Sequence, residues 1–157
     1  MSKPIAYCSI DPGIKGSFCL LVPTTKQVAF KPTTDKPMDL VNWLNQIQKE
    51  LDLRVILIED VHAIFGTSAG SNFSFGFNTG LVHGIARSTG VSVDLVTPKI
   101  WQKYIGVKTK GKLIKKEVAD ICERLYPQVN VRGPRGGLLD GLSDSLMIAH
   151  FAAHKYR

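Results

Sequence analysis

The sequence contains no apolar stretch that approaches the ~18–20 residues a membrane-spanning helix needs. Its first four residues run directly into an apolar strand pattern, without the hydrophobic segment of a secretory signal peptide. We therefore expect a protein with no membrane partner. We also expect it to act in the compartment where it is made.

Cysteine is scarce: Cys8, Cys19 and Cys122 are odd in number and show no CxxC spacing. The first two lie in apolar strand patterns and the third in a helix pattern, which favours buried free thiols over metal ligands. This usage is typical of a reducing compartment and predicts a cytoplasmic location.

Internal repeats and a convincing domain boundary are also lacking. The 157 residues are 44% hydrophobic and 21% charged, which is typical of a soluble globular protein with a sizeable core. We therefore predict a single domain over residues 1–157.

Acidic residues are few in one basic segment, residues 99–135. This segment holds ten Lys and Arg against three acids, so its excess of seven equals the whole net charge of +7. A solvated helix face is the ordinary interpretation of such a segment. A one-sided basic stretch beside a cluster of carboxylates favours a surface for a polyanion.

The hydrophobic pattern predicts alternating strands and helices. Strands are expected at 5–10, 17–22, 27–31, 54–59 and 91–96, and helices at 37–51, 77–88, 98–104, 112–126 and 140–154. Residues 66–76 are rich in Gly and Ser and predict a mobile loop. A three-strand antiparallel meander followed by parallel strands gives an α/β fold with one mixed five-stranded sheet flanked by helices.

Carboxylates end two of these strands, Asp11 after the first and Glu59 after the fourth. A further pair, Asp140 and Asp144, lies one helical turn apart near the carboxyl terminus. Carboxylates held close together at the ends of buried strands are unfavourable unless a cation lies between them. The four acids therefore predict a metal site.

Oxygen ligands without Cys or His favour hard ions, so we expect Mg²⁺ or Mn²⁺. Two such ions could clamp a phosphate group between them, with Asp11 as the bridging ligand. A lysine near the site, Lys115 or one of its neighbours Lys112 and Lys116, could stabilise charge on the phosphate. The other basic side chains would bind backbone phosphates without reading sequence; we expect this of Lys99, Lys103, Lys108, Lys110, Lys112 and Lys116.

Aromatic side chains give weaker signals. Phe73 and Phe75 lie among Ser, Asn and Gly, and either pack under their loop or contact DNA bases. Trp101 is expected in the core or an interface. His150 and His154 form an HxxxH pair without the central Glu of a zinc protease, which favours surface histidines over zinc ligands.

Three segments together resemble the RuvC family of Holliday-junction resolvases, in its smaller phage-like branch. They are residues 9–13 (SIDPG), 57–60 (LIED) and 140–146 (DGLSDSL), and the basic segment before the last helix has the same place. The resemblance covers nearly the whole chain. It implies a ribonuclease-H-like fold and a homodimeric, divalent-metal-dependent endonuclease for branched DNA: four-way junctions, and also flaps and forks.

By the same resemblance, Asp11, Glu59, Asp140 and Asp144 would be the catalytic metal ligands, two ions per site. The sequence departs from the bacterial pattern in two places. Its last two aspartates are four apart instead of three, a spacing that keeps both on one helix face. His62 replaces the Phe that follows the catalytic Glu by three residues, and Phe65, Phe73 or Phe75 could substitute for it.

Two other functions fit the same residues. One is a ribonuclease H that cuts the RNA strand of a hybrid, and the other is a non-catalytic DNA-binding module of the same fold. The presence of all four acids favours an enzyme. A dimer has one further sequence signal, the small residues Gly80, Gly84 and Ala86 of the helix expected at 77–88.

Overall fold

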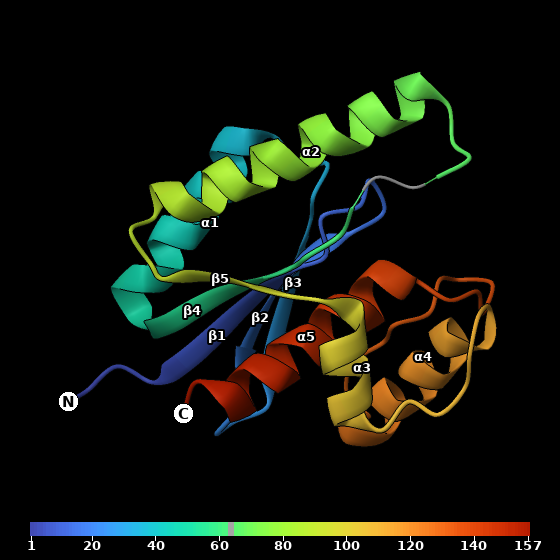
Figure 1. Ribbon diagram of the computed structural model, residues 1–157. Coiled ribbons are helices and arrows are strands. Elements are labelled where there is room, and N and C mark those ends of the chain that lie inside the picture. The colour runs from blue at the N-terminus through green and yellow to red at the C-terminus, as the bar shows by residue number, and fades with distance from the viewer. Residues whose placement is uncertain (63–64) are drawn as a thin grey trace.

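The computed structural model describes residues 1–62 and 65–157, which form five strands and five helices (Figure 1). The strands are β1 (Ile5–Ile10), β2 (Ser17–Val22), β3 (Gln27–Pro32), β4 (Asp52–Glu59) and β5 (Val93–Val96). The helices are α1 (Pro37–Glu50), α2 (Ala69–Ser88), α3 (Pro98–Ile105), α4 (Leu113–Leu125) and α5 (Asp140–Lys155). Together they make the mixed α/β fold that the pattern predicts.

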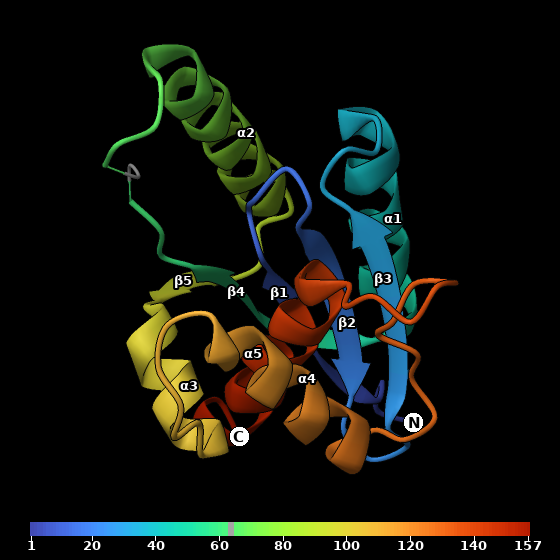
Figure 2. The same ribbon diagram turned by 90° about the vertical axis from the view of Figure 1, so that its right-hand side faces the viewer.

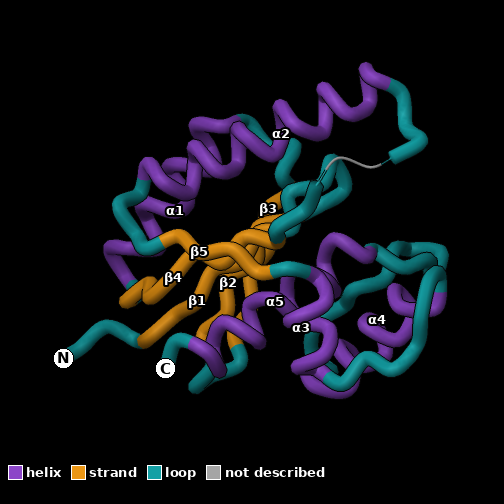
Figure 3. The backbone as a smooth tube through the Cα atoms, in the orientation of Figure 1, coloured by secondary structure: helices purple, strands orange, loops and turns teal. Residues whose placement is uncertain are grey.

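The strands form one sheet in the order β3-β2-β1-β4-β5, at the centre of the molecule in Figure 3. The first three strands pair antiparallel, whereas β4 runs parallel to both β1 and β5. Ile10 lies opposite Ile58, and Glu59 lies opposite Val96. The carboxyl ends of β1, β4 and β5 therefore meet at one edge of the sheet, where open α/β sheets usually place their sites.

Helices cover both faces of the sheet: α1 and α2 lie on one face, and α3, α4 and α5 on the other (Figures 1 and 2). Successive side chains of β1 point alternately to the two faces of the sheet and so pack against both helical layers. Ala6, Cys8 and Ile10 pack with α1 and α2, while Tyr7 packs with α5. Burial on both faces explains why the central strands are almost uniformly apolar.

The start of α2 differs from the sequence prediction. Residues 66–76 are not a loop throughout, because the helix begins at Ala69 instead of Phe77. Ser68 caps it by accepting a hydrogen bond from the backbone N–H of Ser71 (3.1 Å). The buried residues of α2 begin only at Val82. The first three turns therefore have no buried face, and their sequence lacks the hydrophobic periodicity that would predict a helix.

Other boundaries shift by one or two residues at most, which is normal for helix and strand ends. The three cysteines are free and buried, as predicted. Among the described residues, no helix combines the length and apolar character needed to cross a bilayer.

Candidate active site

Asp11 and Glu59 lie on neighbouring strands at the carboxyl edge of the sheet, as predicted. Asp11 follows the last residue of β1, and its Oδ1 accepts a hydrogen bond from the backbone N–H of Gly13 (3.2 Å). Its own N–H donates to the carbonyl of Ser17 (3.0 Å), which closes the turn into β2. This turn holds the Asp11 side chain at the sheet edge.

Helix α5 brings the remaining two acids to this edge through very close packing at glycine. A Cβ atom on Gly141 would lie 2.1 Å from the carbonyl oxygen of Lys15, far inside contact distance. A Cβ on Gly16 would lie 2.0 Å from the carbonyl oxygen of Asp11. Only glycine therefore permits the first turn of α5 to rest on the β1–β2 turn, which places Asp140 and Asp144 next to Asp11.

Buried hydroxyl groups fix the position of α5 on the sheet. Ser9 Oγ donates to the carbonyl of Ser145 (2.5 Å), and Ser17 Oγ donates to the carbonyl of Gly141 (3.0 Å). The hydroxyls of Ser17 and Ser145 also lie 2.7 Å apart. These small polar side chains let the helix approach β1 and β2 closely while satisfying their own hydrogen bonds.

The four predicted carboxylates converge on one cavity of about 470 Å³. Asp11, Glu59, Asp140 and Asp144 all line it, although they come from two strands and a helix that are far apart in sequence. Lys115 lines the same cavity, as does Phe75 on α2.

Burial and mutual repulsion make these carboxylates electrostatically costly. Burial raises the pKa of Asp144 to about 8, and the charges of Asp11, Glu59 and Asp140 add to the rise. Burial, together with the charge of Asp11, raises the pKa of Glu59 to about 7. The pKa of Asp11 is also raised, mainly by burial and further by Asp140. A cation among them would relieve this cost.

Lys115 supplies one positive charge to this cluster. Its ammonium group donates a hydrogen bond to Asp140 Oδ2, which raises the pKa of the lysine. The pairing joins α4 to the start of α5 and places an ammonium group beside the carboxylate cavity. Lys115 thus lies near the site, and its action on a phosphate stays a prediction.

Trp101 is a site residue that the sequence analysis does not identify. Its side chain on α3 is fully buried, and its Nε1 donates to Glu59 Oε1 (2.9 Å). This hydrogen bond stabilises the charged form of Glu59 and opposes the rise in its pKa. The two residues are 42 positions apart, so only the tertiary structure, which brings α3 to the end of β4, reveals the contact.

The donor set suits a hard divalent cation, because the four side chains of this cavity that could ligate one are carboxylates that repel one another. In the part of the chain that the structure describes, no group of three or more His, Cys, Asp or Glu side chains is already arranged to hold a metal ion. The side chain of Asp140 is turned to Lys115 instead. Two ions per site therefore stays a prediction.

The predicted DNA-binding lysines are all exposed. Lys99 and Lys103 lie on α3, and Lys108, Lys110 and Lys112 lie between α3 and α4. Within the described residues, none of these five forms an ion pair with a carboxylate. Lys116 differs, because it pairs with Asp120 (2.7 Å).

One acidic residue shapes the loop that carries three of these lysines. The carboxylate of Glu117 accepts hydrogen bonds from the backbone N–H groups of Lys108 (3.0 Å) and Thr109 (2.8 Å) and from the Thr109 hydroxyl (2.5 Å). The loop backbone is therefore held against α4. The first turn of α4 carries Lys115, which lines the carboxylate cavity.

The two predicted base-contacting aromatics lie on helix α2 and not in a loop. Phe75 faces the carboxylate cavity, whereas Phe73 is 75% exposed and stacks on Phe77 with ring centroids 6.5 Å apart. His62 is exposed, and its imidazole lies 3.8 Å from the carboxylate of Asp60. Whether any of these rings contacts DNA stays a prediction.

Comparisons with known proteins find similarity in structure but none in sequence. No protein-family model and no curated protein matches the sequence. Solved structures match at low identity. RuvC of Thermus thermophilus in complex with a Holliday junction substrate aligns with a TM-score of 0.61 at 18% identity, covering 96% of this chain and 95% of RuvC. The chain has a RuvC-like ribonuclease H fold.

Two further structures agree with this RuvC-like fold. Thermus thermophilus RuvC in a second structure aligns with a TM-score of 0.61 at 17% identity, covering 96% of each chain. The yeast mitochondrial Holliday junction resolvase Ydc2 aligns with a TM-score of 0.53 at 17% identity, covering 95% of this chain and 78% of Ydc2. The fold expected from the three sequence segments is thereby confirmed.

Proposed function

We propose that this protein is a divalent-metal-dependent DNA endonuclease that cleaves branched DNA, with four-way junctions as its principal substrate. The observation that carries the proposal is the convergence of Asp11, Glu59, Asp140 and Asp144 on one cavity in a RuvC-like fold. Flaps and forks share the exposed branch point and are expected as further substrates.

In this proposal the four carboxylates hold Mg²⁺ or Mn²⁺, which when bound activates water and neutralises charge on the scissile phosphate. Trp101 orients Glu59 through its hydrogen bond. Lys115 supplies positive charge to the phosphate from the side of Asp140. The exposed lysines of residues 99–112 hold the DNA backbone on either side of the branch.

The test is a cleavage assay on labelled four-way junction, flap, fork and RNA–DNA hybrid, each with Mg²⁺ or Mn²⁺. We expect cleavage of the branched DNA substrates. The Asp11→Asn variant should lose cleavage yet keep its affinity for the junction, because the removed charge repels DNA. Asp39→Asn on the exposed side of α1 is the matched control and should cleave normally. Cleavage by Asp11→Asn near the wild-type rate would overturn the proposed site.

The ribonuclease-H-like fold also suits a second candidate function, that of an enzyme that cuts the RNA strand of RNA–DNA hybrids. Cleavage of the hybrid without cleavage of the junction would favour it. Junction binding without cleavage of any substrate would favour a non-catalytic binding module.

A symmetric dimer belongs to the same proposal, because a four-way junction offers two equivalent strands to cut. Helix α2 carries an exposed stripe suited to self-association: Phe73, Phe77, Gly80 and Gly84 recur at helical spacing on one face. Phe77 is 67% exposed, and no atom lies within 4 Å of a Cβ placed on either glycine. Ala86, also expected at the interface, is instead buried in the core against the sheet.

A further inference from the structure

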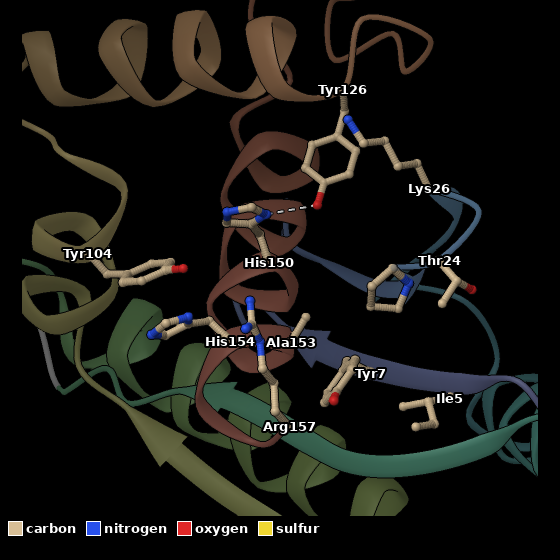
Figure 4. Close-up of a pocket in the computed structure, with 11 residues that line it drawn as sticks. Ile5, Tyr7, Thr24, Lys26, Tyr104, Tyr126, His150, Ala153, His154 and Arg157 are labelled. Atoms are coloured by element: carbon tan, nitrogen blue, oxygen red, sulfur yellow. Dashed lines mark hydrogen bonds between the residues drawn. The ribbon is translucent and has the colours of Figure 1, made fainter.

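A second cavity lies at the end of the molecule opposite the carboxylate cavity, and the proposed nuclease function does not use it. It has a volume of about 350 Å³ and lies where β1 begins and α5 ends (Figure 4). His154 is ten residues beyond Asp144 on α5, about 15 Å along the helix axis. The two cavities are therefore separate sites on the same helix.

Aromatic rings line much of this cavity (Figure 4). Tyr104 of α3 lies over His154, with ring centroids 4.7 Å apart and planes inclined by 30°. Its centroid is 6.0 Å from that of His150, and Tyr104 stays 39% exposed. Tyr126 and Tyr7 line the cavity as well. Because the Tyr104 and His154 rings contact each other, a flat aromatic ligand would stack on their solvent-facing side, which the exposure of Tyr104 leaves accessible.

His150 corrects one sequence expectation, that both histidines of the HxxxH pair are surface residues. It is half-buried, and its Nδ1 lies 2.8 Å from the hydroxyl of Tyr126. That hydrogen bond fixes the imidazole as part of the cavity wall.

Two cations line this cavity at separate places: Arg157 lies beside His154, and Lys26 lies over the ring of Tyr126, 5.9 Å from its centroid (Figure 4). Among the described residues that line the cavity, none is acidic. Lys26 is held there by its left-handed backbone (φ 56°), by a hydrogen bond from Gln128 Nε2 to its carbonyl (3.0 Å), and by donation from its Nζ to the carbonyl of Leu125 (3.4 Å). The cation is positioned, and no carboxylate of the residues that the structure describes forms an ion pair with it.

The electrostatics of His150 agree with an uncompensated positive cavity. Burial lowers the pKa of His150, and the positive charges of His154 and Lys26 lower it further. An anionic group bound here would lower the free energy of all three groups. The cavity therefore combines flat aromatic walls with a site for negative charge.

We propose that this cavity binds a single nucleotide, with the base against Tyr104 and His154 and the phosphate at Lys26. A nucleotide joins a planar aromatic ring to an anion within one small molecule, and the volume lies at the lower end of ligand cavities. The nucleotide has two sources, a free mononucleotide or the terminal unit of a single DNA strand.

The test follows the imidazole NMR signals of the four histidines during titration with deoxyadenosine monophosphate, without divalent metal. We expect His150 and His154 to shift, while His62 and His83 serve as internal controls that do not. Deoxyadenosine alone and inorganic phosphate alone should each bind at least tenfold more weakly. Titration with a tetranucleotide of deoxyadenosine assigns the source: tighter binding than the mononucleotide indicates a strand end, weaker binding a free nucleotide.

Variants complete the test. His154→Ala removes an exposed ring and Lys26→Gln removes the positioned charge, and each should weaken nucleotide binding at least fivefold. Lys49→Gln on α1 removes the same charge outside the cavity and should change nothing. Unchanged His62 and His83 signals show that the variants fold. Equal binding of phosphate and nucleotide, absence of any shift, or full affinity in both cavity variants would overturn the proposal.

Discussion

Asp144 lies on the inner side of α5, where burial and three neighbouring acids disfavour its charged form. Its pKa in the folded protein is about 8, against an ordinary value of 3.8. A raised pKa means that the folded state binds the proton more tightly than the unfolded state does. This contribution to stability is complete below about pH 4 and is lost as the pH rises to 8.

We therefore predict that Asp144→Asn stabilises the metal-free protein while it destroys the proposed activity. Asparagine keeps the shape but carries no charge, so the variant should melt at least about 2 °C higher than the wild type at pH 8 in EDTA. The difference should shrink toward pH 5, where Asp144 is protonated. Melting curves by circular dichroism across this pH range check the prediction.

Mg²⁺ gives the matching control for Asp144→Asn. It should raise the melting temperature of the wild type at pH 8 and should raise that of the variant much less, since a ligand that binds only the folded state stabilises it. A variant that melts below the wild type at pH 8 in EDTA would contradict the electrostatic account.

At the scale of elements, the contact between α5 and the β1–β2 turn depends on Gly141. We predict that Gly141→Ala moves the helix start, because the new methyl group would lie 2.1 Å from the carbonyl oxygen of Lys15. Overpacking of this kind costs about 1–3 kcal/mol of stability. Junction cleavage should fall by roughly 10²-fold, since Asp140 and Asp144 move with the helix.

Gly137→Ala is the matched control for Gly141→Ala, because nothing lies within 4 Å of a Cβ at that position. Its melting temperature and cleavage rate should stay near those of the wild type. If Gly141→Ala cleaves as well as Gly137→Ala, close glycine packing is not what positions the two aspartates.

A second prediction concerns the loop between α3 and α4, which we expect to contribute to DNA affinity. Replacing Lys108, Lys110 and Lys112 by Gln should weaken junction binding and reduce the slope of log affinity against log salt by up to about three, because each phosphate contact releases about one counterion. Fluorescence anisotropy over a range of salt concentrations measures this slope.

A charge-matched control removes three exposed lysines elsewhere, Lys3, Lys36 and Lys49. It lowers the net charge equally and should leave the slope nearly unchanged. An equal loss of slope in both triple variants would mean that overall charge, not the α3–α4 loop, sets DNA affinity.

For the whole molecule, we predict a homodimer in solution through the exposed stripe of α2. Sedimentation at micromolar concentration should give about twice the chain mass of 17.3 kDa. Phe77→Ser should yield a monomer, since it removes a large exposed apolar side chain from the stripe. Phe65→Ser removes a phenylalanine outside the stripe that is more exposed than Phe77, and it should leave the dimer intact. A wild-type monomer, free and on junction DNA, would contradict the prediction.

Local sequence patterns predict much of the architecture. The apolar runs of β1 and β4 are typical of strands buried on both faces, and each is followed or ended by the acid of the site, Asp11 or Glu59. Asp140 and Asp144 share a helix face because their spacing matches the helical period. Short turns between the first three strands predict the meander, and parallel crossovers predict the rest of the sheet.

The contacts that complete the site depend on packing between residues that are far apart in the sequence. The hydrogen bond from Trp101 to Glu59, the ion pair of Lys115 with Asp140 and the close approach of Gly141 to Lys15 join residues that are 25 to 126 positions apart. The early start of α2 at Ala69 and the cavity between Tyr104 and His154 depend on tertiary structure in the same way. Local propensity and periodicity describe one element at a time, so they predict which elements form and which acids end them. Which side chains meet depends on how those elements pack, and only the folded structure determines that.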